Sequence, residues 1–174
     1  MDICCIEEPL NPEISPQEGP SGIFERLAAL QKTIRTKIAL DESWADAKEL
    51  EQALAFPQLR CVVLKIGKLG GVAPALECYE RLQERGVEVW MGGMFETSIS
   101  KRLHAAFQTL PGIAVPGDLA SASSYFRNDV ANPPFEVEGG SLLLNPAGFE
   151  FGLGCELNHA ALAKLLVSSQ TFTR

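Results

Sequence analysis

Short apolar runs recur along the chain at nearly regular intervals, and each run ends in charged or glycine-rich residues. Runs of this length, rich in β-branched and small apolar side chains, are typical of strands buried in a parallel sheet. Successive run ends lie about 24 to 34 residues apart, which is the length of a strand–helix unit. The five predicted strands are Ile3–Ile6, Lys37–Leu40, Cys61–Leu64, Val87–Met91 and Ile113–Val115. The pattern therefore predicts an α/β fold of consecutive parallel strands.

Helical periodicity fills the segments between the predicted strands, and the pattern changes near residue 128. A turn-rich loop is expected over 10–22. The predicted helices cover 23–32, 44–56, 72–85, 98–110 and 120–126. Ser98 is a candidate N-cap of the fourth. A hairpin around a diglycine turn is expected over 135–144, and a last helix over 158–167. We therefore expect a partial barrel over 1–127 and an appended tail over 128–174.

Polar groups at the predicted strand ends are the candidate functional residues. Glu7 and Glu8 follow the first strand, Asp41 and Glu42 the second, and Lys65 the third. In (β/α) barrels the C-terminal strand ends form one rim, where the chemistry takes place. We therefore expect carboxylates and an ammonium group to converge on one pocket. Carboxylate oxygens suit Mg²⁺, and a lysine beside a metal-bound substrate suits proton transfer or charge stabilisation.

Lys65 is an unusual residue for its position, because it directly follows a fully apolar run. Lysine is rarely buried without a partner or a task. The nearby Gly70–Gly71 pair would let the backbone turn sharply or approach a ligand. The alternative is a lysine that ends the strand and extends into water. The residues alone leave both interpretations open.

Composition fits a globular domain and excludes several classes of protein. The 174 residues are 46% hydrophobic and 21% charged, which supports a sizeable core. A net charge of −7 without any basic run argues against a nucleic-acid partner. No apolar stretch approaches the roughly 20 residues that span a bilayer. The N-terminus shows no signal-peptide pattern, so we expect a cytoplasmic protein.

Cysteine and histidine patterns give no sign of a disulfide framework or a zinc site. The five cysteines are odd in number and form no C-x-x-C motif, so reduced thiols are expected. Neither His104 nor His159 has a cysteine at ligand spacing. We expect packing or surface roles for both histidines.

Five motifs, in this order, resemble those of the enolase superfamily, and more narrowly its o-succinylbenzoate synthase and N-acylamino acid racemase branch. The motifs are Ile6–Leu10, Leu40–Ser43, Leu64–Gly71, Gly92–Thr97 and Pro116–Asp118. Each motif alone is weakly specific, whereas five in order at barrel spacing are a strong signal. The resemblance covers almost the whole chain, from the fourth strand of that family's barrel through the eighth and into the tail. It implies an α/β chain that forms about strands 4 to 8 of a (β/α) TIM-like barrel.

The resemblance also implies a role for each matched residue. Glu7 corresponds to the second metal ligand of the family and Asp41 to the third. Lys65 corresponds to the catalytic lysine of the sixth strand. Substrate carboxylate or carbonyl oxygen would lie against backbone N–H groups of the turn formed by Gly92, Gly93 and Met94.

Three further acidic residues stay open between a functional and a structural role. Glu8 and Glu42, next to the two metal ligands, would support those ligands or the local structure. Asp118 would serve the site or the structure of the barrel rim.

The implied activity is the metal-dependent syn dehydration of a succinyl-hydroxycyclohexadiene carboxylate, in menaquinone and phylloquinone biosynthesis. Mg²⁺, with Mn²⁺ as an alternative, would stabilise the enediolate formed when the α-proton leaves the small carboxylate substrate. In that reaction a second-strand lysine abstracts the proton and Lys65 acts as a cation. In the racemases both lysines exchange protons, and the sequence does not separate the two chemistries. A dipeptide epimerase or a muconate cycloisomerase fits less well.

Several family features have no counterpart in this sequence: the capping domain, the second-strand lysine pair and the third-strand aspartate. We therefore expect a fragment, a truncated form or a split gene product that is inactive alone. It would associate with the missing N-terminal part or with itself. A non-catalytic half barrel that needs a partner chain is an alternative. Another is an open doubly wound sheet in which Asp41 and Lys65 meet, although the aspartate pair of phosphate-signalling domains is missing.

Overall fold

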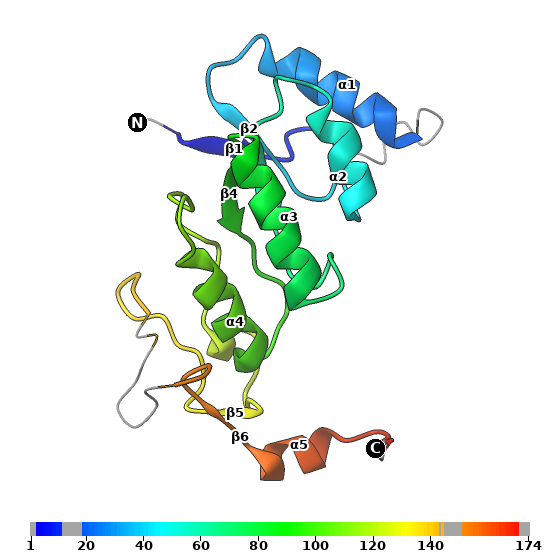
Figure 1. Cartoon of the computed structure of the whole chain (residues 1–174). Helices are drawn as coiled ribbons and strands as arrows, with labels where there is room; N and C mark the ends of the chain where they lie inside the picture. The colour runs from blue at the N-terminus through cyan, green and yellow to red at the C-terminus, as the bar shows by residue number, and fades with distance from the viewer. Residues whose placement is uncertain (1–2, 12–18, 143, 145–150, 171–174) are drawn as a thin grey trace. The chain divides into compact units, whose positions relative to one another are not determined.

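The chain folds into two compact units in the computed structural model, which describes residues 3–11, 19–142, 144 and 151–170 (Figure 1). One unit comprises 1–92 and 110–117, and the other comprises 93–109 and 118–174. Each unit contains its own hydrophobic cluster. The division of the chain into a barrel part and a tail at residue 128 stays a prediction.

A four-stranded parallel sheet organises the first unit. Its strands lie side by side in chain order: β1 (Cys5–Glu7), β2 (Lys37–Leu40), β3 (Cys61–Leu64) and β4 (Glu88–Met91). Every neighbouring pair is parallel. A doubly wound sheet reverses its strand order at a switch point, and this sheet does not. The doubly wound alternative is therefore wrong, and the predicted consecutive strand–helix units are confirmed for these four strands.

Three helices connect the four strands: α1 (Gly19–Gln31), α2 (Ala47–Leu54) and α3 (Val72–Glu84). Helices α1 and α2 lie side by side in Figure 1, and they contact each other. Helix α3 packs against β4, and α1 packs against β2. Helix α1 begins inside the predicted 10–22 loop, because Pro20 is compatible with the first turn of a helix.

Helix α2 is shorter than the predicted 44–56 helix because Asp46 caps it. The Asp46 carboxylate accepts a hydrogen bond from the Glu49 N–H at 2.9 Å. The Glu49 carboxylate in turn accepts one from the backbone just before the cap, at 2.7 Å. This reciprocal arrangement resembles a capping box. Trp44 therefore lies outside the helix, and its indole Nε1 donates to the Leu40 carbonyl at 3.2 Å.

The predicted fifth strand at 113–115 is wrong: no strand forms there in the described part of the chain. Pro111 and Gly112 make a turn in which the Ile113 N–H donates to the Leu110 carbonyl at 3.3 Å. Pro116, on the other side, has no N–H to donate. Three residues bounded in this way offer few backbone donors for a strand ladder. Val115 still packs against a buried cluster of the sheet, formed by Ala39, Cys61, Val63 and Trp90.

The second unit contains α4 (Ser98–Gln108), the 3₁₀ helix η2 (Ala122–Ser124), β5 (Ala131–Asn132), β6 (Glu156–Leu157) and α5 (His159–Leu165). Strands β5 and β6 pair antiparallel, which the sequence did not predict. The predicted 120–126 helix is reduced to η2. The predicted last helix is confirmed as α5, with the Asn158 side chain as its N-cap. The core of this unit is built around Phe135, which is fully buried.

Helix α4 is capped by a distant carboxylate and not by Ser98. Thr97 is the N-cap residue by position. The Asp129 carboxylate accepts a hydrogen bond from the Ser98 N–H at 3.0 Å. The Ser98 hydroxyl accepts one from the Phe135 N–H at 2.6 Å. A contact across about 30 residues of chain thus fixes the start of this helix, which local sequence could not predict.

The diglycine turn of the predicted hairpin is confirmed. Gly139 and Gly140 have φ angles of 57° and 78°, which a primed two-residue turn requires. Glu138 and Ser141 exchange backbone hydrogen bonds of 2.9 and 3.0 Å across it. The pairing extends no further among the described residues; residue 143 lies outside them. No helix in the described ranges is long and apolar enough to cross a membrane.

Thiol burial provides a test of this fold. Cys4 is exposed and Cys5 is partly exposed, whereas Cys61 and Cys78 are buried. Burial raises the pKa of Cys61 to about 12 and that of Cys78 to about 11, so neither forms much reactive thiolate at pH 8. We expect Cys4 and Cys5 to react with a disulfide reagent at least about tenfold faster, as followed by mass spectrometry. Equal rates at all four thiols would contradict the packing of the sheet.

Candidate active site

The polar groups predicted at the strand ends meet at one edge of the parallel sheet. Glu7 ends β1, Asp41 directly follows β2, and Lys65 directly follows β3. Carboxylate oxygens of Glu7, Asp41 and Glu42 all lie within 4.8 Å of one another. Because the strands are parallel and in chain order, their C-terminal ends share this edge. The expected convergence of carboxylates and an ammonium group is therefore present.

Lys65 is buried and paired, so the alternative in which it extends into water is wrong. The side chain is 7% exposed, and its Nζ donates a short hydrogen bond to Asp41 Oδ2. Glu42 Oε1 lies 3.7 Å from the same Nζ. Burial alone would lower the pKa of Lys65, but the hydrogen bond and charge of Asp41, with the nearby glutamates, raise it overall. Lys65 is therefore an ammonium group in this arrangement.

Asp41 is fully buried and is bound by a second ammonium group as well. Lys68 Nζ donates to Asp41 Oδ1 at 2.9 Å and to the Asp41 carbonyl at 2.5 Å. It also donates to the Trp44 carbonyl at 3.2 Å and lies 4.8 Å from the centroid of the indole ring. Burial would raise the pKa of Asp41, but the two lysines lower it, so the carboxylate is ionised.

Sequence analysis did not select Lys68 as a site residue, although Lys65 and Lys68 are three residues apart in one motif. The backbone between them turns back, with the Lys68 N–H bonded to the Lys65 carbonyl at 3.1 Å. Such a turn brings both ammonium groups to one carboxylate. The sequence signal for this role of Lys68 was its position, three residues after Lys65 and separated from it only by Ile66 and Gly67.

Glu7 and Glu42 are the exposed members of the carboxylate group, and Asp41 is the buried one. The pKa of Glu7 is raised to about 7, first by partial burial and then by the adjacent Asp41, although Lys65 opposes this shift. Crowding of like charges therefore makes full ionisation of the group unfavourable at neutral pH. Oxygen donors arranged in this way suit a hard divalent cation, whose charge would offset the repulsion. An acidic group that can bind a metal ion is thus present.

Glu8 contacts the loop that follows β2, not the metal-binding group of carboxylates. Its Oε1 accepts hydrogen bonds from the Asp41 N–H at 2.5 Å, the Ser43 N–H at 3.1 Å and the Ser43 hydroxyl at 2.7 Å. Its backbone φ is 38°, in the left-handed region. The side chain therefore links the end of β1 to the loop that carries Asp41 and Glu42.

Gly92 borders the lysine, as its place after β4 predicts. A Cβ added there would lie 2.4 Å from Val63 Cγ1 and 2.8 Å from Lys65 Cε. Only glycine fits without displacing the strand side chain or the catalytic candidate. Gly92 thus gives Lys65 the space it occupies.

The other predicted substrate-binding residues, Gly93 and Met94, belong to the second unit, as does Asp118. A Cβ at Gly93 would lie 2.6 Å from the Asp118 carbonyl, so the two backbones pack closely. Met94 is 51% exposed, and its N–H donates to Glu96 Oε2 at 3.3 Å. Asp118 therefore contributes its backbone to this turn.

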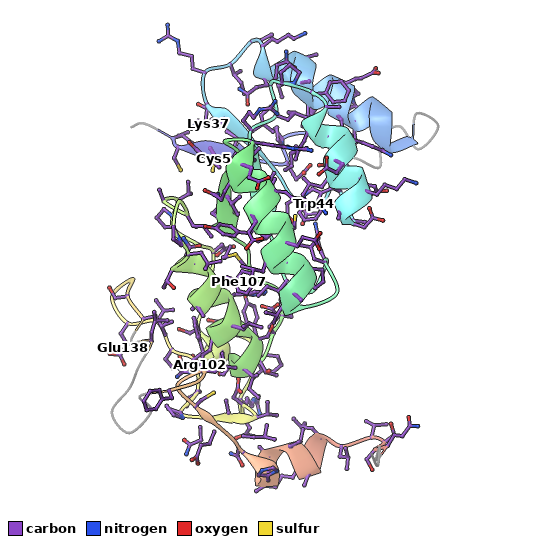
Figure 2. The ribbon with its side chains drawn as sticks, viewed as in Figure 1. Cys5, Lys37, Trp44, Arg102, Phe107 and Glu138 are labelled. Atoms are coloured by element: carbon purple, nitrogen blue, oxygen red, sulfur yellow. The ribbon has the colours of Figure 1, made fainter. Side chains whose placement is uncertain are left out.

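Helix α4 contributes buried polar side chains to the second unit. His104 is fully buried, with Nδ1 3.0 Å from Glu96 Oε2. Burial would raise the pKa of Glu96, but His104 lowers it. Lys101 is buried as well, with its Nζ 4.8 Å from the centroid of the Tyr125 ring. Burial lowers the pKa of Lys101. Arg102 and Phe107, which Figure 2 labels, come from this helix and are buried as well.

Comparisons with known proteins agree with the fold. The profile of the family described as enolase C-terminal domain-like matches residues 1–161. An o-succinylbenzoate synthase of Bacillus subtilis is 31% identical over 145 residues, covering 83% of this chain and 38% of that protein. An N-succinylamino acid racemase of Thermus thermophilus is 33% identical over 130 residues, covering 75% of this chain and 35% of that protein.

Solved structures give the same result. The crystal structure of an enolase-superfamily member from Listeria innocua matches with a TM-score of 0.76 and 29% identity, covering 94% of this chain and 41% of that one. The chain spans about two fifths of the length of the relatives that it matches. Its parallel sheet is part of a (β/α) barrel, and the chain belongs to the enolase C-terminal domain-like family.

Proposed function

We propose that this chain forms part of an o-succinylbenzoate synthase, a carbon–oxygen lyase that dehydrates a succinyl-hydroxycyclohexadiene carboxylate. One observation carries the proposal: Lys65 and the carboxylates of Glu7 and Asp41 are brought together at one edge of the sheet. An ammonium group and a cation-binding group at one edge suit the removal of a proton beside a carboxylate. The synthases among the relatives support the choice of this reaction.

Glu7 and Asp41 would hold Mg²⁺, with Mn²⁺ as an alternative and Glu42 as a further oxygen donor. The bound ion would offset negative charge on the carboxylate substrate. The raised pKa of Glu7 supports this assignment, because carboxylates that repel each other gain most from a shared cation.

Lys65 would act on the substrate as a positioned charge. Its side chain is buried as an ammonium group against Asp41, and a cation at this place suits the stabilisation of developing negative charge. Gly92 leaves room for its side chain. The resemblance also suggests that backbone N–H groups of Gly92, Gly93 and Met94 contact substrate oxygen. In the structure the Gly92 N–H donates to the Leu64 carbonyl at 3.1 Å and the Met94 N–H to Glu96 Oε2 at 3.3 Å, so these two donors would have to change partner to bind substrate.

N-acylamino acid racemisation is the second candidate, because a racemase is among the relatives at similar identity. A racemase requires the lysine to give and take a proton, whereas the synthase requires a lasting cation. Assays with the cyclohexadiene substrate and with N-succinylamino acids in D₂O would separate the two. The racemase would be favoured if the α-carbon of the N-succinylamino acid exchanged its proton for deuterium while the cyclohexadiene substrate was not dehydrated.

The remaining groups of the active site would come from elsewhere. The family resemblance assigns a second lysine and another carboxylate ligand to strands that precede β1. We propose that these strands pair with the chain, as part of a longer polypeptide or as a separate one. Strand β1 pairs only with β2 among the described residues, which leaves an edge for such pairing.

Metal binding is expected to depend on Glu7 and Asp41. Two carboxylates leave most of an octahedral shell to water, so calorimetry should show weak Mg²⁺ binding. Glu7→Gln and Asp41→Asn should each weaken binding at least about tenfold. Glu77→Gln, a change at an exposed helix residue with the same change in charge, is the control. Binding that survives the Glu7 and Asp41 changes together would refute the metal site.

Stability should depend on pH through Glu7. Its folded pKa of about 7 lies above the ordinary value of 4.5, so its contribution to stability is present at low pH and lost as pH rises through 7. The pKa of Asp41 is lowered from its ordinary value of 3.8, so Asp41 changes the stability only at pH values below the range in which Glu7 titrates. Between pH 5 and 8 the chain should lose about 1 kcal/mol relative to Glu7→Gln, allowing for solvent screening of an exposed carboxyl. Parallel urea titrations check this; identical pH profiles for both proteins would contradict it.

Replacing Lys65 should abolish turnover in an assembly that performs the reaction. We expect kcat to fall about 10²–10⁴-fold in Lys65→Met. Because Lys65 is buried against Asp41, this change should also cost roughly 2 kcal/mol of stability, although Lys68 stays bound to Asp41. Lys65→Arg should not rescue activity, since the planar guanidinium is larger than the ammonium group and places its charge differently.

Lys37→Met is the control for Lys65. Lys37 is an exposed lysine of β2 that pairs with Glu88 at the opposite end of the sheet. Its loss should leave kcat unchanged. Normal turnover in folded Lys65→Met would show that the assignment of Lys65 is wrong.

A further inference from the structure

Glu8 holds an unfavourable backbone conformation at the end of β1. Its φ of 38° makes it the one non-glycine residue with positive φ among those that the structure describes. Left-handed backbone is disfavoured for residues with a Cβ. Pro9 follows, and a proline restricts the residue before it as well. Such strain persists only where surrounding contacts fix it, and it concentrates at functional sites.

The contacts that fix Glu8 are those of its carboxylate with the next strand's loop. Oε1 accepts three hydrogen bonds, two from backbone N–H groups of Asp41 and Ser43 and one from the Ser43 hydroxyl. The Glu8 N–H itself donates to the Ala39 carbonyl at 3.1 Å. The left-handed turn thus places the side chain across the gap between β1 and β2.

These bonds begin where the sheet ladder stops. The last paired residues of β1 and β2 are Glu7 and Ala39, and β2 ends at Leu40. The ladder therefore does not fix the Asp41 amide, whereas Glu8 does. The two amides that Glu8 binds lie on either side of Glu42.

We propose that Glu8 is a positioning residue that sets the separation of the carboxylates of Glu7 and Asp41. The proposal rests on the metal site proposed above. Glu7 is carried by β1 and Asp41 by the loop after β2, so a fixed geometry needs a link between these elements. Groups that orient metal ligands change metal affinity about 10–100-fold when they are removed.

Two variants separate the carboxylate bonds from the backbone strain. Glu8→Gly removes the three bonds and also the penalty of positive φ. Glu8→Gln keeps an acceptor oxygen and the side-chain length. We expect Glu8→Gly to speed hydrogen exchange at the Asp41 and Ser43 amides at least about tenfold and to weaken Mg²⁺ about 10–100-fold in calorimetry. Glu8→Gln should stay within about threefold of the parent chain on both measurements.

The controls keep the proposal open to refutation. Glu77→Gln removes one negative charge at an exposed helix residue, so it controls for the change in net charge. If Glu8→Gly fails to fold, Glu8→Asn replaces it. Asparagine tolerates left-handed backbone, but its side chain is shorter than that of glutamate. We expect the same faster amide exchange and weaker Mg²⁺ binding. Unchanged amide exchange and Mg²⁺ affinity in a folded variant would overturn the positioning role. A faster exchange with no change in affinity would overturn it too, since Glu8 would then only stabilise the loop.

Failure of the metal site itself gives a different result. In that case Glu7→Gln with Asp41→Asn would leave Mg²⁺ binding intact, whatever Glu8 does. If Glu8→Gly only destabilised the fold, the midpoint of urea unfolding would fall together with the Mg²⁺ affinity. The positioning role instead predicts that Glu8→Gly loses affinity with little change in that midpoint, because glycine relieves the strain.

Discussion

The buried carboxylate of Asp41 is the constraint on which the rest of the site depends. A fully buried ionised group is costly unless charged and hydrogen-bonded partners surround it. Lys65 and Lys68 supply two ammonium groups, and Glu8 binds the Asp41 amide. Any divalent cation at this edge would share Asp41 with both lysines. Metal affinity and the charge of Lys65 are therefore properties of one electrostatic unit.

Strand alternation explains why the polar groups meet above an apolar layer. Side chains two residues apart point to the same face of a strand. Asp41 shares the face of Ala39, and Lys65 shares that of Cys61 and Val63. Those three partners belong to the buried cluster of the sheet, which Trp90 completes. The cluster gives the strand ends a rigid base, and rigid elements hold functional groups more accurately than loops do.

Sequence predicted the middle of the sheet well because buried parallel strands have a strong local signal. The bounds of β2 and β3 agree with the prediction, and the convergence of Glu7, Asp41 and Lys65 follows from parallel order. The strand at 113–115 was wrong because short apolar runs do not reveal whether a partner is available. The cap of α4 by Asp129 and the pairing of β5 with β6 depend on distant contacts. The burial of Lys65 was unresolved because its partner Asp41 lies 24 residues away.

The two reactions proposed for this site, synthase and racemase chemistry, differ in what they require of the Lys65 proton. Asp41 raises the pKa of Lys65, and the glutamates add to this effect. A cation that took over Asp41 and Glu7 would withdraw that negative charge from the lysine and add its own positive charge. The pKa of Lys65 would then fall toward the range in which a lysine exchanges protons. Within the proposed function, the division of Asp41 between a bound metal and the two lysines would therefore decide whether Lys65 works as a fixed cation or as a base.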